Sequence, residues 1–387
     1  MQPPLSQAAV ATAAGHLADV LEHAIEHGPG QRALVVWDVG SALAVTLAEA
    51  YRRCLPGAAF LQFDTTEPEA VRYAFEAYGA GDLVVLIQST SFRLGAFRIR
   101  LELFRRGLKV VEHPHLARMP GGEGLIYIDA LAYDRAYFRG TGRALQERIT
   151  RAGHGVVESG GAVEANRSGV SAGSANEADA DDVESNSGSS NLGNSDPVNN
   201  ASNSNDSARL IYPAGFEPAK VNIGDYTGMR NVGGQFPIGE VFTESKDLEA
   251  VHGRVRITHF GDTTFSVNRP AHPITLVVER GRVVRALDAT PEFERVLAEI
   301  RAEEGEVWLR ELGFGLNRAL TAERTVTDIG TYERMCGVHL SLGAKHATYN
   351  KPQIRKKTAR FHVDVFAQTE RVLLDGDVVF RDGAWVV

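Results

Sequence analysis

Hydrophobic residues in the first 154 positions form short uninterrupted runs separated by longer segments of mixed polarity. Residues 33–37 and 83–87 are entirely apolar, and residues 59–63 and 108–111 are apolar except for Gln62 and Lys109. Strands of this kind are buried on both faces, which is typical of a parallel sheet covered by helices. The intervening segments 8–27, 41–54, 67–78 and 92–106 have helical periodicity. We therefore predict an α/β domain over residues 1–154, with a doubly wound, mostly parallel sheet.

Residues 209–387 show a different pattern, in which strand signals outnumber helical ones. Segments 254–257, 274–278 and 372–380 are rich in β-branched and aliphatic residues, as expected of strands and hairpins. Residues 291–301 have helical periodicity. We predict that this part of the chain is an α+β, strand-rich domain.

The segment between them, residues 155–208, consists mainly of Ser, Asn, Gly, Ala and Asp and contains no aromatic residue. Such a composition buries too little apolar surface to offset the entropy of ordering, which predicts a disordered insertion. The segment holds nine acidic residues and one arginine, so it accounts for the net charge of −8 of the whole chain. The remainder is nearly neutral, and a nucleic-acid partner is therefore not expected.

Composition also bears on where the protein acts. The chain has two cysteines, no apolar run long enough to span a bilayer, and no basic-then-apolar pattern near residue 1. We expect a cytoplasmic protein in a reducing compartment, without disulfides and without a membrane partner.

The candidate chemistry lies in the C-terminal part. If residues 360–366 (Arg-Phe-His-Val-Asp-Val-Phe) form a strand, His362 and Asp364 share the face opposite the apolar residues. In residues 337–343 (Gly-Val-His-Leu-Ser-Leu-Gly), the same alternation isolates His339 from its apolar neighbours. Each histidine alone is compatible with an ordinary sheet face.

Two glutamates lie in glycine-containing strand segments. Glu240 follows several glycines, and Glu311 shares one predicted strand face with Gly313 and Gly315. Glycines at such positions indicate a bulge or the close approach of a ligand or another backbone. With the two histidines and the aspartate, these glutamates form a ligand set suited to a metal-dependent hydrolase.

These segments resemble the aminopeptidase T/aminopeptidase S family of metallopeptidases. The similar motifs are Pro-Ile-Gly-Glu-Val-Phe-Thr at 237–243, Arg-Glu-Leu-Gly-Phe-Gly-Leu-Asn at 310–317, Gly-Val-His-Leu-Ser-Leu-Gly at 337–343 and Phe-His-Val-Asp at 361–364. The resemblance implies an enzyme that is usually dimeric, acts on peptides and holds two divalent ions such as Zn, Co or Mn. It implies metal ligation by Glu240, Glu311, His339, His362 and Asp364.

The sequence departs from the family at one functional position. The family has a tyrosine seven residues after the first ligand histidine, where this chain has His346. Either His346 or the nearby Tyr349 is expected to take the proton-transfer or oxyanion role, together with Glu311 as a catalytic carboxylate. Basic residues also gather between the histidine ligands: Lys345, Lys351, Arg355, Lys356, Lys357 and Arg360. A solvated loop and a clamp for a substrate carboxylate both explain them.

Two alternatives to a peptidase remain open at this point. His339, His362 and Asp364 also compose a 2-His-1-carboxylate set for Fe(II), as in ring-cleaving dihydroxypyridine dioxygenases, which are similar to the family in their C-terminal halves. A degenerate, non-catalytic relative is the other alternative.

His113 and His115, which flank Pro114 after a predicted strand, are expected to lie in a surface turn.

Overall fold

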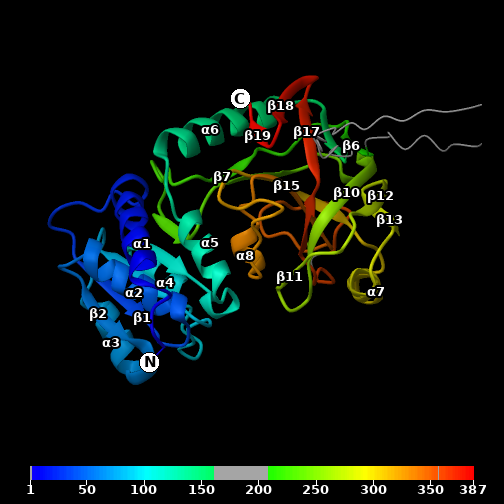
Figure 1. Ribbon diagram of the computed structural model, residues 1–387. Coiled ribbons are helices and arrows are strands. Elements are labelled where there is room, and N and C mark those ends of the chain that lie inside the picture. The colour runs from blue at the N-terminus through cyan, green and yellow to red at the C-terminus, as the bar shows by residue number, and fades with distance from the viewer. Residues whose placement is uncertain (1, 161–207, 356) are drawn as a thin grey trace, which may run out of the picture. The chain divides into compact units, whose positions relative to one another are not determined.

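The apolar runs of the N-terminal part form a five-stranded parallel sheet in the computed structural model, which describes residues 2–160, 208–355 and 357–387 (Figure 1). The order is β2-β1-β3-β4-β8, and every pair is parallel. The strands are β1 (Ala33–Trp37), β2 (Ala59–Gln62), β3 (Leu83–Ile87), β4 (Lys109–His113) and β8 (Gly233–Gln235). The predicted α/β fold of this part is confirmed.

Helices cover both faces of the parallel sheet because its strands are apolar on both sides. Val35 of β1 packs in a core with residues of α1 and α2, whereas Leu34 and Val36 pack with Phe75 of α3 and Leu103 of α4. The helices are α1 (Gln7–Asp19), α2 (Ala42–Cys54), α3 (Pro68–Glu76), α4 (Ile99–Arg105), α5 (Gly122–Ala130) and α6 (Arg135–Arg151), with a π turn at Val20–Ala24 and 3-10 turns at Phe63–Thr65 and Leu116–Arg118.

Helix α5 was not expected from the sequence, and α6 forms although it contains residues of low helix propensity. Helix α6 contains Gly140 and Gly142, and glycine is unfavourable in a helix interior. The structure explains Gly142, because a Cβ there would lie 2.6 Å from a methyl carbon of Ile223. A packing requirement has therefore overridden local propensity. Conversely, the helix predicted over 92–106 forms only as α4.

The second sheet is antiparallel and has fourteen strands (Figure 1). Its main path runs β19-β18-β17-β5-β6-β10-β16-β15-β14-β9-β7, while β11 and β12 pair with β10, and β13 pairs with β12. The strands are β5 (Gly155–Ser159), β6 (Ala208–Tyr212), β7 (Lys220–Asn222), β9 (Glu240–Glu244), β10 (His252–Gly261), β11 (Val267–Asn268), β12 (Ile274–Glu279), β13 (Arg282–Leu287), β14 (Leu309–Gly315), β15 (Gly337–Leu342), β16 (Val363–Ala367), β17 (Thr369–Leu374), β18 (Asp377–Arg381) and β19 (Ala384–Trp385).

Three helical segments accompany this sheet: a 3-10 turn at Leu248–Ala250, α7 (Pro291–Glu304) and α8 (Ile329–Tyr332). Helix α7 begins where Thr290 accepts a hydrogen bond from the backbone N–H of Phe293, with Pro291 in the first turn. Its buried residues are Phe293, Val296, Leu297 and Ile300, a spacing that directs one stripe into the core. The predicted α+β character of this part is confirmed.

The expectation that all of residues 155–208 are disordered is wrong at its ends. Residues 155–159 form the fully buried strand β5, which pairs with β17 on one side and β6 on the other. Val156 and Val157 supply the apolar side chains, and Ala208 begins β6. The rest of the predicted insertion, residues 161–207, lies outside the described residues.

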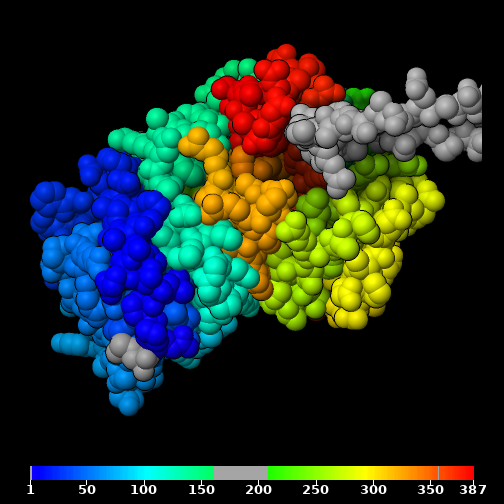
Figure 2. Space-filling view, viewed as in Figure 1, coloured from blue at the N-terminus to red at the C-terminus, as the bar shows by residue number. Residues whose placement is uncertain are grey.

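The two sheets exchange strands, so the boundary predicted at residues 154–209 does not separate them. Strand β8 comes from the C-terminal part of the chain but extends the parallel sheet beside β4. A close backbone approach permits this pairing, because a Cβ on Gly233 would lie 1.9 Å from the carbonyl oxygen of Val110. Residues 1–160 and 208–387 accordingly form one compact unit. Figure 2 shows α6 next to the C-terminal hairpin of this unit, where Arg148 lies 4.0 Å from Asp377.

His113 does not lie in a surface turn, contrary to expectation. It is fully buried at the end of β4, where Tyr51 lies 2.9 Å from Nε2 and Tyr127 lies 2.8 Å from Nδ1. Tyr127 donates its own proton to the carbonyl oxygen of Phe236, so Nδ1–H donates to Tyr127 and Nε2 accepts from Tyr51. Burial lowers the pKa of His113 to about 3, which keeps this structural histidine neutral.

Within the described part of the chain, no helix combines the length and the apolar character needed to cross a membrane.

The pairing of β5 with β6 makes the intervening residues removable. Ser159 and Ala208 are directly opposed, so residues 161–207 are expected to be replaceable by Asn-Gly-Ser, which with Gly160 gives a four-residue hairpin loop. The melting temperature should stay the same or rise, because each halving of a flexible loop saves about 0.6 kcal/mol of closure entropy. Calorimetry on the shortened and full-length proteins measures this, and insoluble or less stable shortened protein would contradict the assignment.

Candidate metal centre

The first group of candidate ligands is assembled by three neighbouring strands. In the register of β9, β14 and β15, Glu240 lies opposite Gly315, and His339 lies opposite Gly313. Glu311 lies on the same face of β14 as both glycines, since residues two apart on a strand share a face. The sheet thus gathers Glu240, Glu311 and His339 from positions far apart in the sequence.

The distances within this group are short enough for shared coordination. His339 Nε2 lies 3.2 Å from Glu240 Oε1 and 3.4 Å from Glu311 Oε1. One ligand atom from each of the three residues falls within 4.8 Å of the others, and all three side chains are buried. Two carboxylates and an imidazole are donors that divalent transition metals accept.

Gly313 leaves the space that the imidazole of His339 occupies. A Cβ built on Gly313 would lie 2.0 Å from His339 Cε1 and 2.1 Å from Nε2. Gly313 therefore marks the close approach of a side chain, which was not expected, whereas Gly315 marks the expected approach of another backbone, since its Cβ would lie 1.9 Å from the carbonyl oxygen of Met335. The ladder between β14 and β15 is also irregular between Leu309 and Leu312, so a bulge lies next to the same site.

A second group combines the other two predicted ligands with one residue that the sequence did not reveal. Glu333, His362 and Asp364 also offer ligand atoms within 4.8 Å of one another. Asp364 belongs to β16 opposite Ser341, and His362 immediately precedes that strand, 3.1 Å from Asp364. Glu333 follows α8, outside any strand, so no face periodicity points to it; only the tertiary fold brings it here.

Arg334 connects the two groups. Its guanidinium lies 3.2 Å from Glu240 and also pairs with Glu333. The side chain is buried, and the neighbouring carboxylates raise its pKa above an already high ordinary value despite the opposing effect of burial. Arg334 is therefore a permanent cation between the carboxylates of both groups.

Several carboxylates and cationic groups are buried together at the site. Burial and the adjacent Asp364 raise the pKa of Glu333 well above its usual range. Burial opposes charge on His362 as well, but Asp364 outweighs it and raises the pKa of His362 to about 10. Asp364 Oδ1 has the Nε2 atom of His362 as its ion-pair partner at 3.1 Å. Because buried carboxylates need cationic partners, this donor set fits divalent ions.

Glu311 links the first group to His346. Its Oε2 lies 2.8 Å from His346 Nε2, while the backbone N–H of Thr348 donates to His346 Nδ1. Since Nδ1 accepts, the proton of a neutral His346 resides on Nε2, facing Glu311. Burial alone raises the pKa of Glu311, but His339 and His346 outweigh it and lower that pKa below its usual range.

Tyr349 does not reach the site, which corrects the expectation that it shares the catalytic role. Its hydroxyl donates to the carbonyl oxygen of Pro218 at 2.8 Å, and its ring packs against Phe242 and His346. It supports the position of His346 and does not line the pocket. Of the two candidates, only His346 faces the ligand groups.

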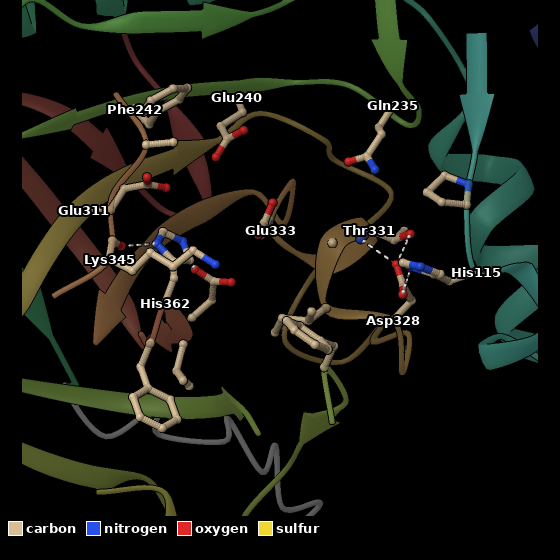
Figure 3. Close-up of a pocket in the computed structure, with 18 of the residues that line it drawn as sticks. His115, Gln235, Glu240, Phe242, Glu311, Asp328, Thr331, Glu333, Lys345 and His362 are labelled. Carbon is tan, nitrogen blue, oxygen red and sulfur yellow. Dashed lines mark hydrogen bonds and ion pairs between the residues drawn. The ribbon is translucent and has the colours of Figure 1, made fainter. Parts of the chain in front are cut away.

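Five of the six ligand residues line a pocket of about 700 Å³, and the sixth, His339, is fully buried next to it. Figure 3 shows Glu240, Glu311, Glu333 and His362 on one side of this pocket and His115 with Asp328 on the other. His115 lies 3.3 Å from Asp328, which also pairs with Arg118 at 3.1 Å. His115 is thus a pocket residue, although it was expected in a surface turn.

The comparisons with known proteins bear on the fold. No family model matches the chain, and no curated protein sequence matches it. Among solved structures, wild-type AmpT from Thermus thermophilus is similar, with a TM-score of 0.52 and 15% sequence identity, over 97% of this chain and 99% of that chain. At this identity the similarity establishes a shared fold.

Substituting Gly313 by alanine is expected to disrupt the first group, because the new methyl must displace the His339 imidazole. We expect a loss of about 1–3 kcal/mol in unfolding free energy and weaker binding of Zn²⁺ in calorimetric titrations. Gly140→Ala is the matched control, since nothing lies within 4 Å of its Cβ. Equal Zn²⁺ affinity in Gly313→Ala and the control would argue against this geometry.

Proposed function

We propose that this protein is a metal-dependent aminopeptidase that uses two divalent ions, such as Zn, Co or Mn, and releases N-terminal residues from peptides. The observation that carries the proposal is the pair of three-ligand groups on one pocket wall. Glu240, Glu311 and His339 would hold one ion, and Glu333, His362 and Asp364 the other. The fold shared with AmpT and the motifs resembling aminopeptidases T and S support the same activity.

When bound, such ions polarise a carbonyl group and lower the pKa of water. The residues of the chain would move the protons. The Glu311 carboxylate is placed to accept a proton, and His346 carries its proton on Nε2, 2.8 Å from Glu311. We assign His346 the donor role towards the departing amine, in place of the tyrosine that the family has there, and the proton that Glu311 has accepted from water replaces the one that His346 gives up.

The carboxylates of the second group would also favour substrates with a free N-terminus. The α-amine of an unblocked peptide is a cation or a metal ligand, and either form is favoured beside Glu333 and Asp364. An acetylated N-terminus offers neither. The proposed enzyme is therefore an exopeptidase. This selectivity comes from the charge of the N-terminus and not from the size of the pocket.

The dioxygenase alternative is less well supported by the geometry. Its Fe(II) set requires His339, His362 and Asp364 to converge. Among the described residues, the groups within 4.8 Å instead unite His339 with Glu240 and Glu311, and His362 and Asp364 with Glu333. An iron triad also leaves Glu240 and Glu311 without a role.

The proposal predicts hydrolysis that depends on metal and on a free amine. Unblocked Leu-peptides should be cleaved, N-acetylated ones resistant, and activity lost on chelation should return with Co, Mn or Zn. Glu240→Gln should lower both metal content and turnover, because a neutral amide is a poor ligand. Glu370→Gln, on an exposed strand position, is the control. Chromatography of products and elemental analysis measure these effects.

Three results would contradict the proposal. Equal cleavage of blocked and unblocked peptides would exclude the exopeptidase mechanism. One iron per chain with oxygen uptake on a dihydroxylated aromatic substrate would support a dioxygenase. Absence of any turnover by metal-loaded protein would favour a non-catalytic relative.

The role of His346 is tested separately from ligation. His346→Gln should lower kcat by about 100-fold to 10,000-fold, the usual contribution of a general acid or base, while bound metal is retained. His346→Tyr should keep more activity, because a phenol also donates a proton. His272→Gln, an exposed histidine outside the pocket, is the control. Metal loss in His346→Gln would make it a ligand instead.

A further inference from the structure

The wall of the pocket next to the second ligand group carries two cationic side chains. Lys345 and Arg360 both line the pocket, and they lie at the two ends of the segment that connects β15 with β16. Neither side chain has an ion-pair or hydrogen-bond partner among the residues that the structure describes. Both are exposed, and so both are available to a ligand in the pocket.

The other basic groups near the pocket are already paired, which sets these two apart. Lys351, in the same connecting segment, binds Glu217. On the opposite wall, Arg118 pairs with Asp328. Lys345 and Arg360 are therefore the pocket-lining Lys or Arg residues, within the described ranges, whose charge is not compensated.

One carboxylate connects the two backbone segments that carry Lys345 and Arg360. Glu304, at the end of α7, accepts hydrogen bonds from the backbone N–H groups of Ala344 (2.7 Å), Arg360 (2.6 Å) and Phe361 (2.8 Å). The N–H of Lys345 donates to the carbonyl oxygen of Phe361 at 2.9 Å. The backbone of both cations is thus fixed before any ligand binds, which reduces the entropy lost on binding.

This pair of cations lies directly beside the proposed reaction centre. The carbonyl oxygen of Lys345 accepts a hydrogen bond from His362 Nδ1 at 3.1 Å, and Figure 3 shows Lys345 alongside His362. His346 is the next residue in the chain. When one end of a substrate is held at the ligand groups, a charged group at its other end is therefore close to Lys345 or Arg360.

We propose that Lys345 and Arg360 bind the C-terminal α-carboxylate of short peptide substrates, so that the enzyme prefers dipeptides and tripeptides with a free C-terminus. This inference rests on the proposed aminopeptidase function. The carboxylates of the ligand groups would bind the α-amine of the peptide, and Lys345 and Arg360 would bind its α-carboxylate. The pocket volume of about 700 Å³ is within the range of small-molecule sites. Charge-assisted hydrogen bonds to Lys and Arg are the usual means of recognising a carboxylate.

The preference is measured by comparing kcat/KM for Leu-Ala with that for Leu-Ala-amide. The wild-type protein should favour the free acid by about 10-fold to 100-fold, the range of one or two charge-assisted hydrogen bonds. Lys345→Met should reduce this ratio about 10-fold, and Lys345→Arg should restore part of it because the charge returns. Lys357→Met, an exposed lysine that does not line the pocket, should keep the wild-type ratio.

Three outcomes would overturn the proposal. Equal kcat/KM for the acid and the amide in the wild-type protein would show that no carboxylate is recognised. A comparable preference for Leu-Asp-amide would assign the cations to an acidic side chain and remove the restriction to short peptides. An unchanged ratio in the double variant Lys345→Met, Arg360→Met would place recognition on other residues.

The test also separates this inference from the proposed function. Cleavage of Leu-Ala-amide reports peptidase activity without the C-terminal carboxylate. If neither peptide is cleaved, the aminopeptidase proposal fails, and calorimetry with Gly-Gly and Gly-Gly-amide then tests the cations directly. Tighter binding of Gly-Gly that is lost in Lys345→Met would support carboxylate recognition, and equal binding of the two ligands would overturn it.

Discussion

The antiparallel register of β9, β14, β15 and β16 is the constraint on which the rest of the site depends. Side chains on one face of four paired strands come within a few ångströms of one another wherever the register aligns them. Here that register opposes Gly315 to Glu240, Gly313 to His339 and Ser341 to Asp364. A slip of one residue in any pair would turn a ligand into the apolar core and a hydrophobic residue into the pocket.

The same register requires tolerance for buried charge. Four carboxylates, Glu240, Glu311, Glu333 and Asp364, gather beside the pocket, where Arg334, His339 and His362 pair with them. The surrounding strands are held by apolar packing on the other face, with Phe314 and Leu340 fully buried. Hydrophobic burial thus maintains an arrangement of charges that is unfavourable by itself, as functional sites often require.

Much of the fold and most of the candidate site follow from short patterns in the sequence. The apolar runs of β1 and β3 were predicted with their observed bounds because residues buried on both faces have little freedom in composition. Alternation placed His339 and Asp364 on ligand-bearing faces for similar reasons. Glu333 was missed because it follows a one-turn helix, where no periodicity applies. The bounds of α6 were not predicted, because its Gly142 is explained only by contact with the distant Ile223. Strand β5 was hidden by the low-complexity residues that follow it.

The exchange of strands between the two sheets limits where the chain can be divided into independent halves. Strand β8 completes the parallel sheet from the C-terminal part, and β5 completes the antiparallel sheet from the N-terminal part. Neither half of the gene therefore encodes all the strands of one sheet. A fragment cut at either side of residues 161–207 would present an unpaired strand edge, which invites association with other chains. The two halves are therefore expected to remain on one chain, whereas the connection between β5 and β6 is a position where inserted sequence disturbs neither sheet.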